Sequence, residues 1–198
     1  MKLNIEKRSA SIGYDYEVTQ NNENIFTAVS EKFLGFLNIK VWSNNWREQI
    51  VKIKNKRFTL LKPRYRIYYQ NRKLDFRTIS WYKRHFQFEY NESVYEIYGH
   101  HKTWKYSVYL NTNQVAWWDK KIKKMQGPDL FEIEMNNNCN KELIVSFCLI
   151  LDNLIEICIG ERGDLFHSDG TVSLGFNKYG EIKAFNKAWT PKELNNDL

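Results

Sequence analysis

Residues 141–159, KELIVSFCLILDNLIEICI, decide how the rest of this chain is interpreted. From Leu143 to Leu151 the run is apolar on nearly every side, and only Ser146 interrupts it. We predict a helix that Asn140 caps at its N-terminus and that Gly160 ends. A helix without a polar face must be enclosed on most sides, either by protein or by lipid.

Enclosure by protein is the better explanation of this helix. The apolar run is shorter than the roughly 20 residues that a helix needs to cross a bilayer. Asp152, Asn153 and Glu156 would also fall inside any longer span. We therefore expect the helix to lie inside the protein, surrounded by the remainder of the chain.

The chain before the helix alternates apolar and polar residues up to about residue 135, which is typical of half-buried antiparallel strands. Turn residues separate the runs at intervals of about 8 to 12 residues; examples are Gln20–Asn24, Gln70–Arg72 and Asn111–Asn113. We predict ten to twelve strands. The alternating runs include Tyr14–Val18, Val51–Leu60, Tyr65–Tyr69, Phe86–Tyr90, Trp104–Leu110 and Phe131–Met135.

These elements predict a mainly β fold, a closed antiparallel barrel of about 12 strands around one central apolar helix, within residues 1–160. A barrel of this size has a lumen wider than side chains alone can fill, and a helix about 10 Å across could occupy it. Residues 161–198 are acidic and contain several glycines, and we interpret them as a C-terminal extension. A hairpin of 172–176 with 181–185 and a last short helix opening at Thr190-Pro191 are possible there.

The order of these elements resembles the tubby C-terminal-like superfamily, which includes the LURP-one-related and phospholipid scramblase families. The resemblance rests on the segments Tyr14–Val18 and Tyr65–Tyr68 and on the apolar helix that ends at Asp152. It covers roughly residues 10–160. It implies a twelve-stranded barrel around a central helix, and tubby domains bind phosphoinositides through basic surface residues. No ligand residue of the family can be aligned to a position here.

Positive charge is concentrated in the middle of the chain. Residues 40–124 carry 20 basic and 6 acidic residues, a net charge of +14, whereas residues 125–198 have a net charge of −6. Such a segment could face a polyanion. The simpler interpretation, which the sequence favours, is that lysine and arginine fill the outward positions of strands.

The candidate binding site lies in the segment Trp117-Trp118-Asp119-Lys120-Lys121-Ile122-Lys123-Lys124. Tryptophan favours the headgroup zone of a membrane and lysine is attracted to anionic lipid. The alternatives are stacking on single-stranded nucleic acid, which we consider unlikely, or an edge hairpin protected by lysines with one Trp inside the barrel. A second basic set has the same ambiguity and consists of Arg64, Arg66, Lys83 and Arg84.

The sequence favours a non-enzymatic binding module that docks on anionic phospholipid headgroups, peripheral to a membrane and without a transmembrane segment. The alternative is a scaffold that meets a protein partner through its C-terminal extension. No catalytic residue, metal site or cofactor is predicted: adjacent His100 and His101 would point to opposite faces of a strand, and Ser146 and Cys148 lie on the buried helix. The three cysteines lack a CxxC spacing, and the N-terminus lacks a signal peptide, so a cytoplasmic protein is expected.

Overall fold

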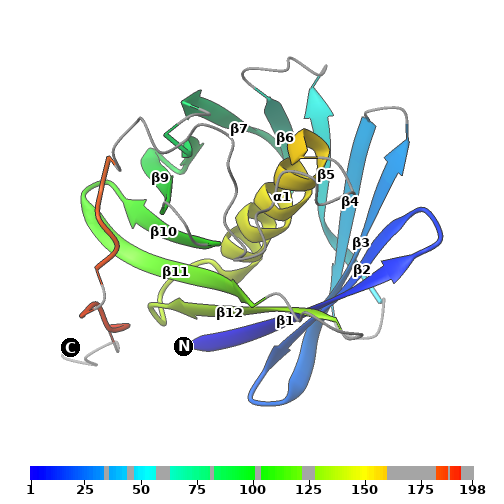
Figure 1. Cartoon of the computed structure of the whole chain (residues 1–198), viewed down its shortest axis with the longest axis horizontal. Helices are drawn as coiled ribbons and strands as arrows, with labels where there is room; N and C mark the ends of the chain where they lie inside the picture. The colour runs from blue at the N-terminus through cyan, green and yellow to red at the C-terminus, as the bar shows by residue number, and fades with distance from the viewer. Residues whose placement is uncertain are drawn as a thin grey trace.

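The computed structural model describes residues 1–33, 36–43, 47–56, 63–80, 83–100, 104–121, 128–159, 182–186 and 188–192 (Figure 1). These residues form twelve strands followed by one helix. The strands are β1 (Lys2–Ala10), β2 (Gly13–Gln20), β3 (Glu23–Phe33), β4 (Phe36–Ser43), β5 (Gln49–Lys56), β6 (Arg64–Tyr69), β7 (Arg72–Ser80), β8 (His85–Tyr90), β9 (Ser93–Gly99), β10 (Lys105–Leu110), β11 (Asn113–Lys121) and β12 (Asp129–Met135). The helix is α1 (Lys141–Ile159).

The strands close into one antiparallel barrel. Each strand pairs with the next along the chain, and β1 pairs with β12 to complete the circle. The closing seam runs from the pair Lys2 and Glu134 to the pair Lys7 and Asp129. The predicted closed barrel of about 12 strands is therefore confirmed, and closure leaves no free strand edge in the sheet.

Short turns with left-handed backbone connect several strand pairs. Asn21 and Asn22 have φ values of 52° and 66°, and Gln70 and Asn71 have values of 48° and 59°. Two consecutive residues with positive φ are typical of the hairpin turn whose twist matches that of the flanking strands. Asparagine tolerates this conformation better than most residues, which explains why turns form at these positions. The predicted turns at residues 20–24 and 70–72 are confirmed.

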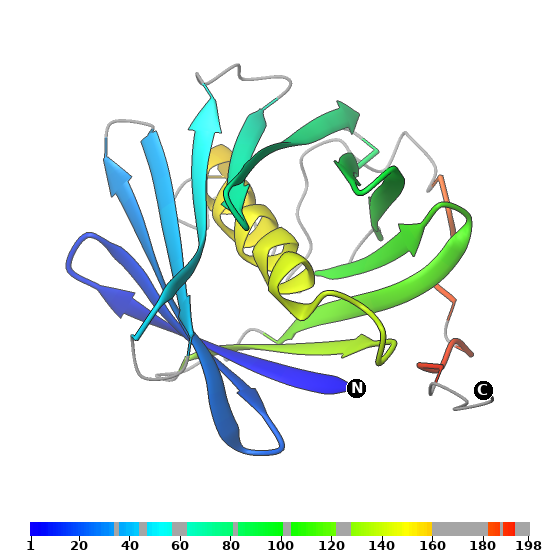
Figure 2. The same ribbon diagram turned by 180° about the vertical axis from the view of Figure 1, so that it is seen from behind.

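The helix α1 occupies the lumen, and strands surround it in two opposite views (Figures 1 and 2). The Asn140 side-chain oxygen accepts a hydrogen bond of 2.9 Å from the backbone N–H of Leu143, so the predicted N-cap is confirmed. Phe147 is fully buried, and its ring centroid lies 5.0 Å from that of Phe88 and 5.6 Å from that of Phe76. The predicted helix bounds of about 141–159 agree with the structure, and Gly160 lies outside the described residues.

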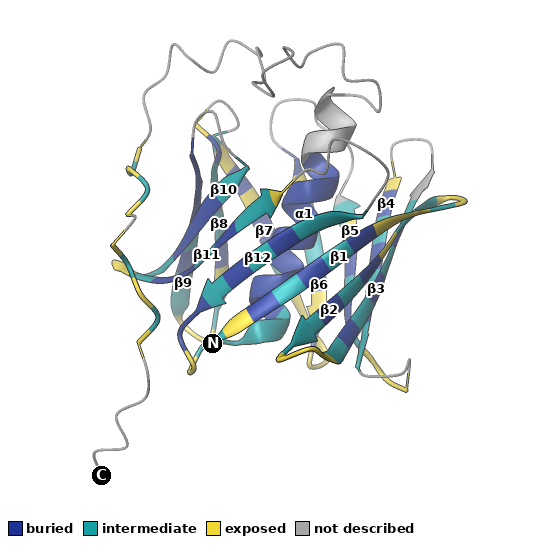
Figure 3. Ribbon diagram, turned by 60° about the horizontal axis from the view of Figure 1, so that its bottom comes forward, coloured by how far each residue is buried: buried dark blue, intermediate teal, exposed yellow. Residues whose placement is uncertain are grey.

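Burial alternates along the strands, as the sequence pattern predicts (Figure 3). On β1, Leu3 and Ile5 are fully buried while their neighbours Lys2 and Glu6 face outward. The inward side chains of the strands and the side chains of α1 form a single hydrophobic core. Because the helix is buried all round, residues Leu143–Leu151 need no polar face.

Some predicted elements fall outside the described residues. These are Phe58 and Leu60, the first strand of the C-terminal hairpin, and most of the last helix. Residues 182–185, the described part of the second hairpin strand, are not a strand, and residues 190–192 are not helical. Among the described residues, no helix is long and apolar enough to cross a membrane.

Candidate functional site

Among the side chains that the structure describes, the outer surface of β4, β5, β6 and β7 carries seven cationic ones, which we call the basic face. Inward residues such as Ile39, Ile53 and Ile67 alternate with them and are fully buried. Neighbouring strands lie about 4.8 Å apart, so the face spans roughly 14 Å from β4 to β7. The basic face consists of Lys40, Lys52, Lys54, Arg64, Arg66, Lys73 and Arg77.

Like charges lie directly opposite one another across this face. Lys40 is in register with Lys52, Lys54 is in register with Arg66, and Arg64 is in register with Arg77. Directly opposed like charges destabilise a sheet by a few tenths of a kcal/mol each. Three such pairs on adjacent strands gather positive charge on one wall, and Asp75 on β7, in register with Arg66, is an acidic residue within the face.

The acidic partners of the basic face stand mainly at its margins. Glu31 on β3 accepts a hydrogen bond of 3.0 Å from Lys40, and Glu89 on β8 lies 3.6 Å from Arg77. Hydrogen bonds from Asn38 and Lys40 hold the pKa of Glu31 below its ordinary value. Within the described part of the chain, Lys54 and Arg64 form no ion pair, so no acidic side chain neutralises these two cations by direct pairing.

The predicted site on β11 does not form one surface, because strand alternation sends its residues to opposite sides of the barrel wall. Trp118 is 1% exposed and stacks on Tyr106 inside the barrel, with ring centroids 5.1 Å apart. The Lys120 side chain also points inward and is 8% exposed. Trp117 and Lys121 point outward, and Lys121 pairs with Glu132 at 2.6 Å. Predicting Trp118 and Lys120 as surface ligands was therefore wrong, and Lys123 and Lys124 lie outside the described residues.

The second predicted basic set is also divided. Arg64 and Arg66 belong to the basic face, and Lys83 is exposed in the turn before β8. Arg84 is 7% exposed and its guanidinium lies 3.4 Å from the backbone oxygen of His100, so its prediction as a surface ligand was wrong. Arg84 adopts a left-handed backbone conformation with φ of 47°. The residue types at 83 and 84 do not predict that one of these two neighbouring basic side chains is exposed and the other buried.

A buried ionic cluster joins α1 to the closing seam of the barrel. One Asp152 carboxylate oxygen lies 2.6 Å from the Lys120 ammonium, and the other lies 2.9 Å from the Lys7 ammonium. Tyr16 donates a hydrogen bond of 3.0 Å to the second oxygen. Lys120 also pairs with Asp129 at 2.9 Å. Strands β1, β2, β11 and β12 thus all contact one carboxylate cluster at the C-terminal half of the helix.

The pKa values of the cluster reflect burial set against opposite charge. Burial lowers the pKa of Lys7 to about 8, although the negative charge of Asp152 favours the protonated lysine. Burial also acts to lower the pKa of Lys120, but Asp152 and Asp129 outweigh it and the pKa lies above its ordinary value. Burial acts to raise the pKa of Asp152, but Lys120 and Lys7 outweigh it and the pKa lies below its ordinary value.

Asn153 completes the polar interior beside this cluster. Its side-chain nitrogen donates hydrogen bonds of 2.9 Å to the Tyr16 hydroxyl and to the backbone oxygen of Leu149. The side chains of Asp152 and Lys7 are 1% and 4% exposed, which leaves them no face for a ligand. We assign the cluster to fixing the helix within the barrel. The sequence did not lead us to predict this ionic cluster. The one indication was Asp152, the acidic residue that ends the enclosed apolar run.

A family comparison bears on the whole barrel. The family model described as LURP-one-related matches residues 1–152. The chain belongs to the LURP-one-related family. This family is part of the tubby-like C-terminal superfamily, so the resemblance expected from the sequence is confirmed. The searches of curated proteins and of solved structures found no match.

The matched residues of this LURP-one-related barrel include β1–β12 and the helix as far as Asp152. The family match therefore ends at the residue that anchors the buried cluster. The described C-terminal residues 182–186 and 188–192 lie beyond the matched part of the chain.

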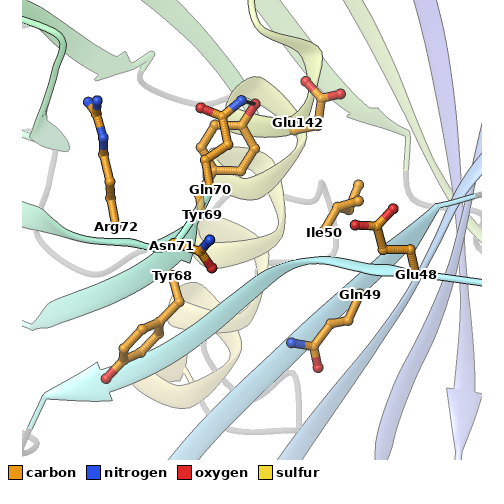
Figure 4. Close-up of a pocket in the computed structure, with 9 residues that line it drawn as sticks. All are labelled: Glu48, Gln49, Ile50, Tyr68, Tyr69, Gln70, Asn71, Arg72 and Glu142. Carbon is orange, nitrogen blue, oxygen red and sulfur yellow. Dashed lines mark hydrogen bonds between the residues drawn. The ribbon is translucent and has the colours of Figure 1, made fainter.

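A surface pocket of about 540 Å³ opens at the end of the LURP-one-related barrel where α1 begins (Figure 4). Figure 4 shows Tyr69 and Gln70 projecting beside the first turn of the helix, whereas Tyr68 and Gln49 point away from it. The Tyr69 hydroxyl accepts hydrogen bonds from Asn140 at 2.8 Å and from Gln70 at 3.1 Å. Because its lining side chains diverge, this pocket presents no convergent set of polar groups. No group of three metal-ligating side chains occurs among the described residues.

Proposed function

We propose that this protein is a non-enzymatic binding module that docks on anionic phospholipid headgroups through the basic face of β4–β7. The observation that carries the proposal is the direct opposition of Lys54 with Arg66 and of Arg64 with Arg77 across adjacent strands. An isolated barrel gains nothing from placing like charges opposite one another. An anionic surface would relieve that repulsion.

The shape of the basic face suits a membrane surface better than a single small anion. The cations are spread over four strands of a barrel wall and do not converge on a pocket. A lysine or arginine near an anionic leaflet contributes about 1 kcal/mol, and the attraction decays within a Debye length. Several cations on one wall can therefore hold the barrel at the surface of a membrane without insertion. We propose a cytoplasmic protein that associates peripherally with membranes.

The test compares two triple variants that lose the same charge. The first, Lys54→Gln, Arg64→Gln and Lys73→Gln, neutralises exposed positions of the basic face. The control, Lys2→Gln, Arg8→Gln and Lys121→Gln, neutralises cations that are 58%, 63% and 54% exposed on β1 and β11. Each is sedimented with phosphatidylcholine vesicles, with and without phosphatidylserine, at low and at physiological ionic strength.

We expect the wild type and the control to bind the anionic vesicles and to be released by salt. The basic-face variant should bind about 100-fold more weakly, because three cations contribute about 3 kcal/mol together. Equal binding by the two triple variants would refute the assignment of the face. Binding that ignores both salt and phosphatidylserine would refute the anionic ligand itself.

A further inference from the structure

The C-terminal residues 182–186 and 188–192 pass along the outer wall of β9, β10 and β11, away from the basic face (Figures 1 and 2). Two hydrogen bonds fix the end of this segment. The Trp189 indole N–H donates to the backbone oxygen of Gln114 at 3.1 Å, and the Lys192 backbone N–H donates to the Asn136 side-chain oxygen at 2.7 Å. The segment is therefore docked on the barrel.

The first contact of the segment is an aromatic site for an ammonium group. The Lys183 ammonium lies 3.7 Å from the ring centroid of Tyr109 and 5.1 Å from that of Tyr98. The two tyrosine rings meet edge to face at 5.6 Å, so they present the cation with two adjacent π surfaces. A cation within about 6 Å of a ring face is attracted by the ring quadrupole. Tyr98 on β9 and Tyr109 on β10 thus form a cage that is filled by a lysine.

The second contact lies two residues further along the segment. The Phe185 ring packs edge to face on His100 at 5.1 Å and on Trp117 at 5.6 Å. The Lys105 ammonium lies 5.1 Å from the same ring. An aromatic ring is therefore held by β11, by β10 and by the residue after β9.

The barrel wall under these two contacts is buried although it faces outward. By strand alternation Tyr98 and Ser107 point away from the lumen, yet they are 5% and 0% exposed. His100 is 2% exposed and its ring nitrogen lies 2.8 Å from the Ser107 hydroxyl. An outer barrel wall is ordinarily half exposed. This wall is instead covered, and the docked segment contributes to the cover through Lys183 on Tyr98 and Phe185 on His100.

We propose that the outer wall of β9–β11 is a binding site for an extended peptide of the pattern Lys-x-Phe, filled here by the chain's own Lys183-Ala184-Phe185. Lys183 and Phe185, at positions i and i+2, both reach this wall, which matches one ammonium site and one ring site. The partner that fits in trans is an extended segment of another protein that presents a lysine and a phenylalanine at this spacing. That segment must displace residues 182–192, which lie outside the part matched by the family model.

The test measures binding of a fluorescein-labelled synthetic peptide of residues 181–192 to the full chain by fluorescence anisotropy. The variant Lys183→Ala/Phe185→Ala empties both contacts. The control Ile182→Ala changes a neighbouring side chain that is 43% exposed. A segment on the same chain competes at an effective concentration on the order of 1 mM, so a peptide of about 0.1 mM affinity should bind the wild type roughly tenfold more weakly than the emptied variant.

We expect the emptied variant to bind the peptide at least about tenfold more tightly than the wild type and Ile182→Ala. A peptide with alanine at both positions should not bind, and Tyr109→Ala in the emptied variant should abolish binding. Equal affinity for the emptied variant and the wild type, or equal binding of the alanine peptide, would overturn the proposal. If circular dichroism shows that the double variant is unfolded, Lys183→Ala alone, which leaves the Phe185 ring in place, decides on the same criteria.

Discussion

Replacing Asp152 by asparagine removes the charge on which the buried cluster depends while keeping the size of the side chain. Lys7 would then lose its 2.9 Å ion pair inside the barrel, and Lys120 would keep only its pair with Asp129. Removing one partner of a buried ion pair typically costs 3–5 kcal/mol, because an uncompensated charge stays buried. We therefore expect Asp152→Asn to lower the free energy of unfolding by about 4 kcal/mol.

The chain offers a matched control one residue away. Lys121 and Glu132 lie 2.6 Å apart, the same distance that separates Lys120 from Asp152. Their side chains are 54% and 33% exposed, and a pair of that kind contributes less than about 1 kcal/mol. The two pairs therefore differ in burial and not in separation.

The assay is urea denaturation followed by circular dichroism, with thermal melts of the same proteins. For a chain of this size about 4 kcal/mol corresponds to a fall in Tm of roughly 8–16 °C for Asp152→Asn, whereas Glu132→Gln should change Tm by a few degrees at most. A double variant, Lys7→Met with Asp152→Asn, should recover part of the loss because one uncompensated cation is removed. Equal effects of the two single variants, or a neutral Asp152→Asn, would refute the reasoning from burial.

Three further predictions concern single positions. Lys7 has a pKa of about 8 in the fold against 10.5 in the unfolded chain, so the unfolded chain binds more protons between these two pH values and the free energy of unfolding should rise with pH there. Lys7→Met should remove a rise of up to about 3 kcal/mol, measured by urea titrations at several pH values. An unchanged dependence of the unfolding free energy on pH would show that Lys7 is not its cause. Asn140→Ala removes the N-cap of α1 and should cost about 1 kcal/mol by the same titration, with no change counting against the cap. Gly13 has a φ of 141°, and a Cβ there would lie 1.8 Å from the backbone oxygen of Ser30; Gly13→Ala should therefore strongly destabilise the barrel, whereas Ile12→Ala, at a position that is 64% exposed, should leave Tm nearly unchanged.

The barrel and its helix could be predicted because each follows from a local pattern. Period-two alternation determines which side of a strand faces the core, as at Leu3 and Ile5 on β1. The apolar run Leu143–Leu151 requires enclosure, and a sheet of that many strands is the element of the chain large enough to supply it. These inferences need no knowledge of which distant residues meet.

The candidate sites could be predicted less well, because they depend on register between strands. The opposition of Lys54 and Arg66 follows from the pairing of β5 with β6, which a single sequence does not reveal. Residue type misled the prediction at Trp118 and Lys120, since both face the lumen in the alternation of β11. Lys120 is stable inside the barrel because it forms an ion pair with Asp152. The two residues are 32 positions apart in the sequence, so no local pattern predicts their contact.

Lysine acetylation footprinting tests the proposed membrane contact most directly, because it locates the bound surface on the unaltered protein. The protein is treated with an amine-reactive acetylating reagent with and without phosphatidylserine vesicles, and modification is quantified at each lysine by mass spectrometry. If the basic face contacts the membrane, vesicles should protect Lys54 and Lys73 and leave Lys2 and Lys121 as reactive as before. Protection of Lys2 and Lys121, with Lys54 and Lys73 unchanged, would contradict it.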